Sequence, residues 1–150
     1  IGQNVLERYT LSDVIYYFKG QRASGLFEQA DSHLKIPGGG GTADLRGGWY
    51  DATGDYGIHF SQLDYTTYFN TQQVPLVVWS LLKTNQALAD RKDPNFQQYE
   101  RRLMDEAMFG ADFLVRMHVP HHSFYSTISA PGAGKLASDR RIAGNGGQHK

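Results

Sequence analysis

The chain has 150 residues, of which 40% are apolar, and this is enough to bury the core of one ordinary domain. Fifteen basic residues balance fifteen acidic ones, so the chain lacks the net positive field that attracts nucleic acids and anionic membranes. The absence of cysteine excludes disulfides and thiolate metal sites but leaves the compartment open, with a periplasmic or secreted location slightly favoured over the cytoplasm. We therefore predict neither a nucleic-acid partner nor a membrane partner.

The first predicted element is a helix over Leu11–Arg22, within the stretch TLSDVIYYFKGQR. Thr10 and Ser12 are its candidate N-caps, because a short side-chain oxygen can accept from the first free N–H groups of a helix. The predicted apolar face holds Val14, Tyr17 and Phe18, which follow helical spacing.

A long glycine-rich segment from Ala23 to about Phe69 shows no periodicity, and it includes PGGGG at Pro37–Gly41. Loops of this length are uncommon in compact domains and are usually either functional or disordered. Disordered segments are poor in aromatic residues. This one contains Trp49, Tyr50, Tyr56, Phe60, Tyr65, Tyr68 and Phe69. We therefore predict one long, ordered and functional loop.

Two further helices are predicted in NTQQVPLVVWSLLKTNQALAD and DPNFQQYERRLMDEAMFGADFLVRMHV. Pro75 suits the first turn of one, with Asn70 or Thr71 as cap, while Asp93 caps the other with Pro94 at its first position. The apolar faces contain Val74, Val77, Val78, Leu81 and Leu82 in one helix, and Phe96, Tyr99, Leu103, Ala107, Gly110, Leu114 and Met117 in the other. A short polar link between two such helices predicts an antiparallel hairpin.

The remaining sequence adds little regular structure. A short run at Ser123–Ser129 alternates as a strand would, the glycine-rich tail from Ile128 predicts a surface loop, and Trp79 is expected in the core. Arg101 and Arg102 are interpreted as solvated helix charges. Because the apolar stripes find no obvious second layer within the chain, we expect it to be the first part of a larger array of helical hairpins.

Two aspartates, Asp51 and Asp55, stand in the stretch RGGWYDATGDYGIHF. Cleavage of a glycosidic bond commonly needs one carboxylic acid to protonate the leaving oxygen and one carboxylate to attack the sugar or to deprotonate water. Aspartates also favour glycine-rich turns for local reasons, since their side chains bond to nearby backbone. Trp49 and Tyr56 favour the sugar interpretation because flat rings stack on sugar faces. Arg46 could orient one aspartate through a paired hydrogen bond.

The chain resembles the catalytic domain of glycoside hydrolase family 9, a family that includes many inverting cellulases. The resemblance runs from about residue 10 to 129 and rests on five segments in order: YYFKGQRASG, LRGGWYDATGDYG, VPLVVWSLL, EAMFGADFLVRMH and SFYSTI. It implies an all-α fold, an (α/α)6 barrel, of which this chain supplies the first helices and a long loop bearing the catalytic base. It also implies that residues 1–150 are the N-terminal portion of one catalytic domain, truncated at both ends, with the remainder of that domain as a partner.

The site residues follow from the same resemblance. Asp55 matches the family's catalytic base and Asp51 its helper in holding the attacking water, although the family pattern Asp-Ala-Gly-Asp is lengthened here by Thr53. Trp49, Tyr50, Tyr56 and Arg46 are the expected carbohydrate contacts. The proton-donating glutamate of the family lies far toward the C-terminus of a longer domain, so no acid of this chain is assigned that role.

Three activities remain open at this point. The resemblance favours inverting hydrolysis of β-1,4-glycosidic bonds, as in an endoglucanase. One branch of the family removes glucosamine from chitosan oligosaccharides, and a non-catalytic carbohydrate-binding scaffold would keep the same helices. No metal or organic cofactor is predicted: His118, His121 and His122 are interrupted by Pro120, and PGGGG lacks the Lys and Ser/Thr of a phosphate-binding loop.

Overall fold

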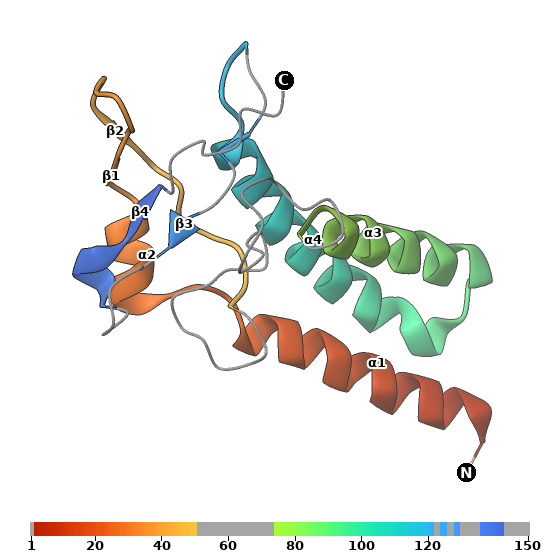
Figure 1. The fold of residues 1–150 in the computed structure, drawn as a ribbon. Coiled ribbons are helices and arrows are strands. Elements are labelled where there is room, and N and C mark those ends of the chain that lie inside the picture. Colours follow the sequence, from red (N-terminus) through yellow and green to blue (C-terminus); the bar gives the residue numbers. More distant parts are fainter. Residues whose placement is uncertain (1, 51–73, 122–123, 126–127, 130–135, 143–150) are drawn as a thin grey trace.

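A computed structural model describes residues 2–50, 74–121, 124–125, 128–129 and 136–142, and within them the fold is mostly helical (Figure 1). The α-helices are α1 (Gln3–Gly20), α2 (Gly25–Asp31), α3 (Val74–Arg91) and α4 (Gln97–Met117), with 3-10 turns η1 (Pro94–Phe96) and η2 (Ala137–Asp139). The strands are β1 (Leu34–Lys35), β2 (Thr42–Ala43), β3 (Ile128–Ser129) and β4 (Arg141–Ile142). The predicted helical class is therefore confirmed within these residues, with two small antiparallel sheets in addition.

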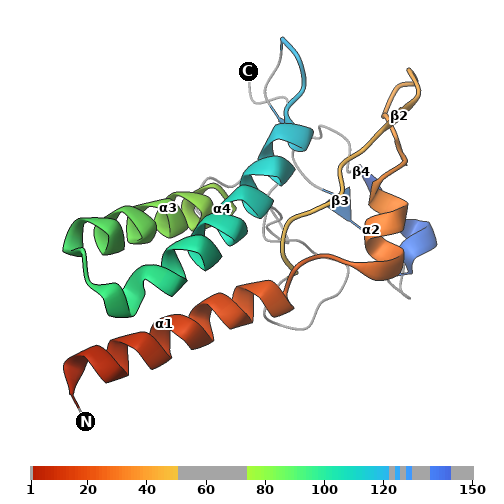
Figure 2. The ribbon, with the colours of Figure 1, turned by 180° about the vertical axis from the view of Figure 1, so that it is seen from behind.

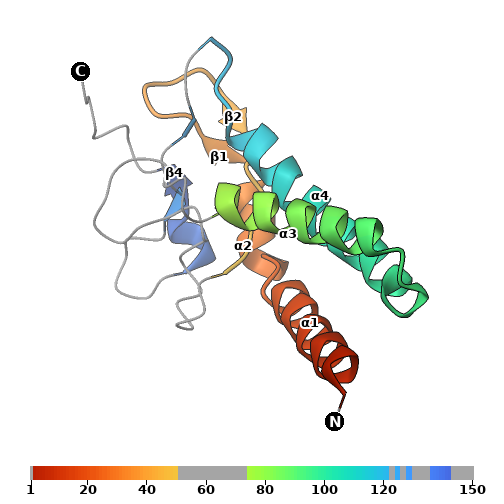
Figure 3. The ribbon, with the colours of Figure 1, turned by 90° about the vertical axis from the view of Figure 1, so that its right-hand side faces the viewer.

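The predicted hairpin of α3 and α4 is confirmed. Both helices lie side by side, and their link is at the end remote from the strands (Figures 1 and 3). Asp93 caps η1 by accepting the Asn95 backbone N–H at 2.9 Å, and Pro94 fits the first turn because it needs no N–H partner there. The buried faces match the predicted stripes at most positions, except that Phe113 is buried more deeply than Leu114, and Leu82 is exposed.

Helix α1 begins earlier than predicted, at Gln3, so Thr10 and Ser12 lie inside it and do not cap it. Its predicted face is right only at Phe18, which packs against the core: Val14 and Tyr17 are more than 40% exposed, whereas Ile15 is buried and Leu11 packs beside it. Positions 11, 15 and 18 follow the i, i+4, i+7 spacing of one helix face, which the interleaved tyrosines obscure.

Arg102 is not a solvated charge. It reaches from α4 to α1, where its guanidinium donates to Ser12 Oγ at 3.2 Å and to the Ser12 carbonyl at 3.4 Å, and it lies near the Tyr99 ring. Arg102 therefore links the two helices.

The segment from 23 to 50 is not one loop. It contains α2 and an antiparallel hairpin of β1 and β2, in which Leu34 pairs with Ala43 and Lys35 with Thr42. The PGGGG stretch makes the turn, and its four glycines all have φ between 85° and 108°, a region that disfavours residues with a Cβ.

The tail is corrected in the same way. Strand β4 pairs with β3, with Ile128 opposite Ile142, and it packs beside β1. The guanidinium of Arg140 forms a two-pronged ion pair with Asp31, at 2.8 and 2.7 Å, and both side chains are fully buried. This pair joins α2 to the chain just before β4.

Several large apolar side chains of the hairpin lie at the surface. Trp79 is 56% exposed, which contradicts its predicted place in the core. The outward stripes contain Leu76, Trp79 and Leu82 on α3, and Met104, Met108 and Val115 on α4. No helix in the described parts of the chain combines the length and apolar character that crossing a bilayer requires.

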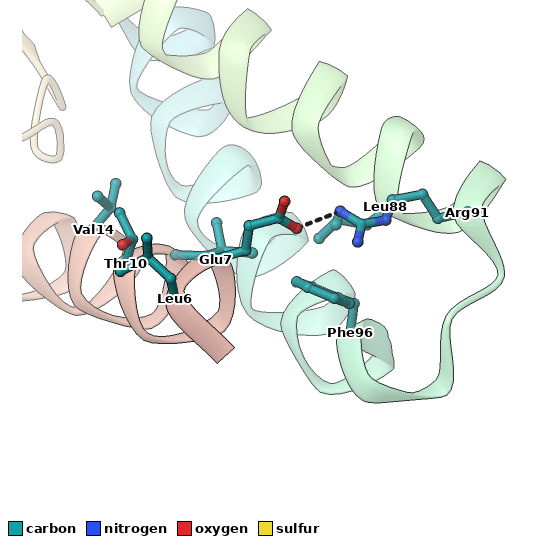
Figure 4. A pocket seen from close by; sticks show the side chains of 8 residues that line it. Leu6, Glu7, Thr10, Val14, Leu88, Arg91 and Phe96 are labelled. Atoms are coloured by element: carbon teal, nitrogen blue, oxygen red, sulfur yellow. Dashed lines mark hydrogen bonds and ion pairs between the residues drawn. The ribbon is translucent and has the colours of Figure 1, made fainter. Parts of the chain in front are cut away.

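A groove of about 420 Å³ lies between the N-terminal half of α1 and the linked end of the hairpin (Figure 4). Its lining is mainly apolar, including Leu6, Val14, Leu88 and Phe96, and Glu7 pairs with Arg91 across it at 2.9 Å. Among the predicted site residues with described positions, Arg46, Trp49 and Tyr50, none lines this groove.

Candidate active site

Three predicted site residues, Asp51, Asp55 and Tyr56, lie outside the residues that the structure describes. What is described is the approach to them, residues 44–50, which follows β2 and reaches the C-terminal end of α1 (Figure 2). The contacts of this approach determine where Tyr50, the residue before Asp51, lies.

Backbone hydrogen bonds fix the approach against the residues that follow α1. Arg22 and Trp49 form an antiparallel bridge, the Ala23 N–H donates to the Gly48 carbonyl at 2.9 Å, and the Tyr50 N–H donates to the Gln21 carbonyl at 2.7 Å. The residue immediately before Asp51 is therefore held by main-chain bonds.

Tyr50 is held by its side chain as well. Its hydroxyl donates to the Ser24 carbonyl at 3.0 Å and accepts the Ser24 N–H at 3.2 Å, while its ring meets Phe27 edge-on. Burial raises the pKa of the Tyr50 phenol above its ordinary value, despite the hydrogen bond from Ser24. The phenol stays protonated at neutral pH and so remains a donor.

Trp49 is completely buried, which is at odds with its predicted role as a stacking surface for sugar. Its ring packs against Phe18 and Phe109, each with centroids 5.7 Å away, and Nε1 donates to Glu106 at 3.1 Å. A Cβ on Gly110 would come within 2.3 Å of the indole, so only glycine at 110 leaves room for it. Trp49 anchors the approach in the core.

Glu106 and Arg22 complete this anchor and were not predicted from the sequence. Arg22 Nε donates to both carboxylate oxygens of Glu106, at 3.1 and 3.2 Å, and Nη2 reaches Glu106 at 2.9 Å and Asp105 at 2.8 Å. The guanidinium also covers the Phe109 ring, 4.5 Å from its centroid. Burial alone would lower the pKa of Arg22, but the two carboxylates outweigh it and raise that pKa.

One signal could have identified Glu106. Glu106 lies at helical spacing from Leu103, Ala107 and Gly110 on the buried face of α4. This spacing predicts a carboxylate among apolar side chains. A buried acid requires a cationic partner. Nothing local to the sequence indicates that this partner is Arg22.

Arg46 pairs with an aspartate, but within the described residues that aspartate is Asp44. Its Nε lies 3.2 Å from Asp44 Oδ2, and its backbone N–H donates to Oδ1 at 3.2 Å. Its carbonyl accepts from Arg116 of α4 at 3.4 Å. Next to it, Gly47 has φ 115° and lies against Phe113, so the backbone passes close to α4.

Two of the three clustered histidines, His118 and His121, have described positions. The His118 ring meets Phe124 edge-on at 5.4 Å, His121 has φ 64°, and His122 lies outside the described residues. Among the residues with described positions, no three His, Asp or Glu side chains gather in a way that could hold a metal ion.

Comparison with known proteins gives the family. A search of curated proteins finds no significant match to this chain. The sequence profile described as "Glycosyl hydrolase family 9" matches residues 8–140, which include the motif, the anchor residues and both hairpin helices. Because this match covers most of the 150 residues, the chain belongs to glycosyl hydrolase family 9, a family of glycoside hydrolases that act on carbohydrates.

Proposed function

We propose that the chain carries the base side of an inverting glycoside hydrolase that cleaves β-1,4-glycosidic bonds, as an endoglucanase does. Asp55 is the general base and Asp51 orients the attacking water. The observation that carries this proposal is the family match over residues 8–140, which contains both aspartates in the motif GGWYDATGDYG. The anchored approach at Gly48–Tyr50 supports it, because a base loop needs a fixed entry.

The reaction assigns one task to each carboxylate. The water oxygen forms a bond to the anomeric carbon while its proton passes to Asp55, and the bond to the leaving sugar breaks as an acid protonates the departing oxygen. In inverting enzymes the acid and base stand ~6.5–9.5 Å apart, which leaves room for the water. We place the acid, a glutamate, beyond Lys150, in the remainder of the catalytic domain.

The surface of the hairpin supports that placement. Trp79 and Met108 represent two outward apolar stripes, one on each long helix. Such stripes are buried in helical architectures built of repeated hairpins. We infer that the rest of an (α/α)6 barrel packs on them.

The aromatic residues of the motif have different proposed roles. Tyr56 keeps its proposed part in sugar binding. Trp49 is reassigned to positioning the motif, since its indole is buried and already bonded to Glu106. Tyr50 is half-buried with its hydroxyl engaged by Ser24, so only its ring is proposed to meet substrate. Arg46, which is half exposed, could still approach a sugar from its free side.

The test replaces each aspartate by asparagine in the full-length protein. Asp55→Asn should lower turnover by several orders of magnitude while sugar binding survives, because an amide keeps the shape but cannot accept the proton; the loss of general-base catalysis alone costs ~10²–10⁴-fold. Asp51→Asn should also be severe. If the extra residue Thr53 moves the loop, the two variants exchange rank.

Azide identifies the base, since this small anion attacks without needing deprotonation. It should rescue the true base variant and give a glycosyl azide of inverted configuration. Release of glucose oligomers from β-1,4-glucan supports the endoglucanase assignment, whereas release of glucosamine from chitosan oligosaccharides would redirect the substrate. Near-normal turnover in both variants would remove the catalytic role of this loop, and binding without turnover in the unmodified protein would make it a carbohydrate-binding scaffold.

A further inference from the structure

We propose that Arg22, Glu106 and Trp49 form a positioning cluster that sets the place of Asp51, and through it the attacking water. The inference rests on the proposed function of the aspartates. None of the three side chains needs to touch substrate, so they are positioning residues and not catalytic ones.

Glu106 is the centre of the cluster. It projects from the buried face of α4, is 1% exposed, and receives hydrogen bonds from Arg22 and Trp49 on its two oxygens. Charge-assisted bonds of this kind are short and directional, and an arginine fork restricts orientation more than a lysine does. The three side chains therefore hold α4, the residues that follow α1 and the approach at Trp49 in one arrangement.

The cluster fixes the register of the approach. Trp49 points into the core to reach Glu106 where it forms its antiparallel bridge with Arg22, and successive residues of a strand-like pairing point to opposite sides. A shift of one residue would turn the indole outward and leave a buried carboxylate short of a partner, which is costly. The bonds from Ala23 to Gly48 and from Tyr50 to Gln21 preserve the same register along the backbone.

The link to Asp51 is short. Asp51 follows Tyr50 directly, and consecutive Cα atoms are about 3.8 Å apart. A buried ion pair is weak evidence for stability, and setting one register is among the best-attested uses of buried polar groups. This explains why a charged cluster lies where apolar packing alone could fill the space.

The first experiment compares two arginines in the full-length protein. Arg22→Gln should lower kcat by about 10- to 100-fold with KM nearly unchanged, since a displacement of about 1 Å can cost that much in rate. Arg22→Lys should retain part of kcat because the charge persists. Arg102→Gln is the matched control: Arg102 also links α4 to α1, but it does so through Ser12 and makes no hydrogen bond to the described residues of the approach, 44–50. It should leave kcat unchanged, with circular dichroism checking the fold of each variant.

A second experiment is a double-mutant cycle of Arg22→Gln with Asp51→Asn. If Arg22 acts through Asp51, its substitution should have little further effect on kcat in the Asp51→Asn background. Trp49→Phe, which removes one N–H and keeps most of the ring area, repeats the cycle with a milder change should Arg22→Gln fail to fold.

The outcomes separate the two proposals. Multiplicative effects in the cycle, or equal losses of kcat in Arg22→Gln and Arg102→Gln, would overturn the positioning role while leaving the aspartates catalytic. Near-normal turnover in Asp51→Asn and Asp55→Asn would instead overturn the proposed function itself.

Discussion

The helical hairpin and the strand-bearing half of the molecule are held together in different ways. Helices α3 and α4 are neighbours in sequence and join through a repeated apolar stripe that ends in residues such as Leu88 and Phe96. The half that contains α2 and the four strands has elements of only two to seven residues, and long-range charged contacts such as Asp31–Arg140 connect it. Periodic packing tolerates single changes, whereas the short elements of the second half leave it more dependent on the buried Asp31–Arg140 pair.

The largest effect should come from breaking the buried pair in the strand-bearing half. Arg140→Ala leaves the Asp31 carboxylate buried without its cation, and such a loss costs about 3–5 kcal/mol in unfolding free energy. Urea unfolding of the full-length protein measures it. The double change Asp31→Leu with Arg140→Met should cost less, since it removes both charges. An equal or larger loss in the double variant would contradict the charge argument.

The same variant should show a pH dependence. Burial already raises the pKa of Asp31 against the opposing effect of Arg140, and removing Arg140 raises it further. The pKa of Asp31 is then higher in the folded protein than in the unfolded one. Protonation of this acid therefore stabilises the folded state fully below the unfolded pKa, and that stabilisation is lost as the pH rises through the folded pKa. The deficit of Arg140→Ala relative to the unmodified protein should therefore shrink in acid, and a constant deficit would refute this.

A middle-sized effect is expected where the two halves meet. Gly110→Ala would bring a Cβ to 2.3 Å from the Trp49 ring and 2.6 Å from Val78 Cγ2, and overpacking of this kind costs typically about 1–3 kcal/mol. Because the indole is forced aside, kcat should fall together with stability. Gly20→Ala, at a helical glycine with open space around it, is the control and should preserve both. Thermal unfolding and turnover of the two variants decide the matter.

The smallest effect belongs to the hairpin. Asp93→Ala removes the cap of η1 and should lower stability at neutral pH, whereas Asp93→Asn keeps an acceptor and should lower it less. The hydrogen bond from the Asn95 N–H lowers the pKa of Asp93 in the folded protein. The contribution of this carboxylate to stability is therefore present above the unfolded pKa and is lost as pH falls through the folded pKa. The difference between Asp93→Ala and the unmodified protein should vanish in strong acid, which a pH series of urea unfolding curves would test.

The same contrast explains how much the sequence could predict. The hairpin was predictable because two long stripes at helical spacing meet at Asp93 and Pro94, where cap and proline suit one turn. The buried face of α1 was not predictable, because the tyrosines beside Ile15 have apolar rings that do not require burial. Strands β1–β4 have two residues each, too few for any alternation to show.

The candidate site was predicted only in part. The motif aspartates and Tyr56 stay predictions, because they lie outside the described residues. Trp49 was placed near the site but given a surface role, as a tryptophan next to glycines carries no mark of burial. Arg22 and Glu106 were missed because their pairing depends on how α1 and α4 meet in space, and sequence spacing does not encode that.

The tight contact of Gly110 with Trp49 also constrains how the chain can change over evolutionary time. A larger residue at 110 is compatible only with a smaller one at 49, yet a smaller one at 49 forfeits the N–H that Glu106 accepts. A substitution at position 49, 106 or 110 is therefore unfavourable unless the other two positions also change, so we expect these three residues to vary together. Relatives that lack the tryptophan should be the ones in which glycine at 110 and the acid at 106 are also free to vary.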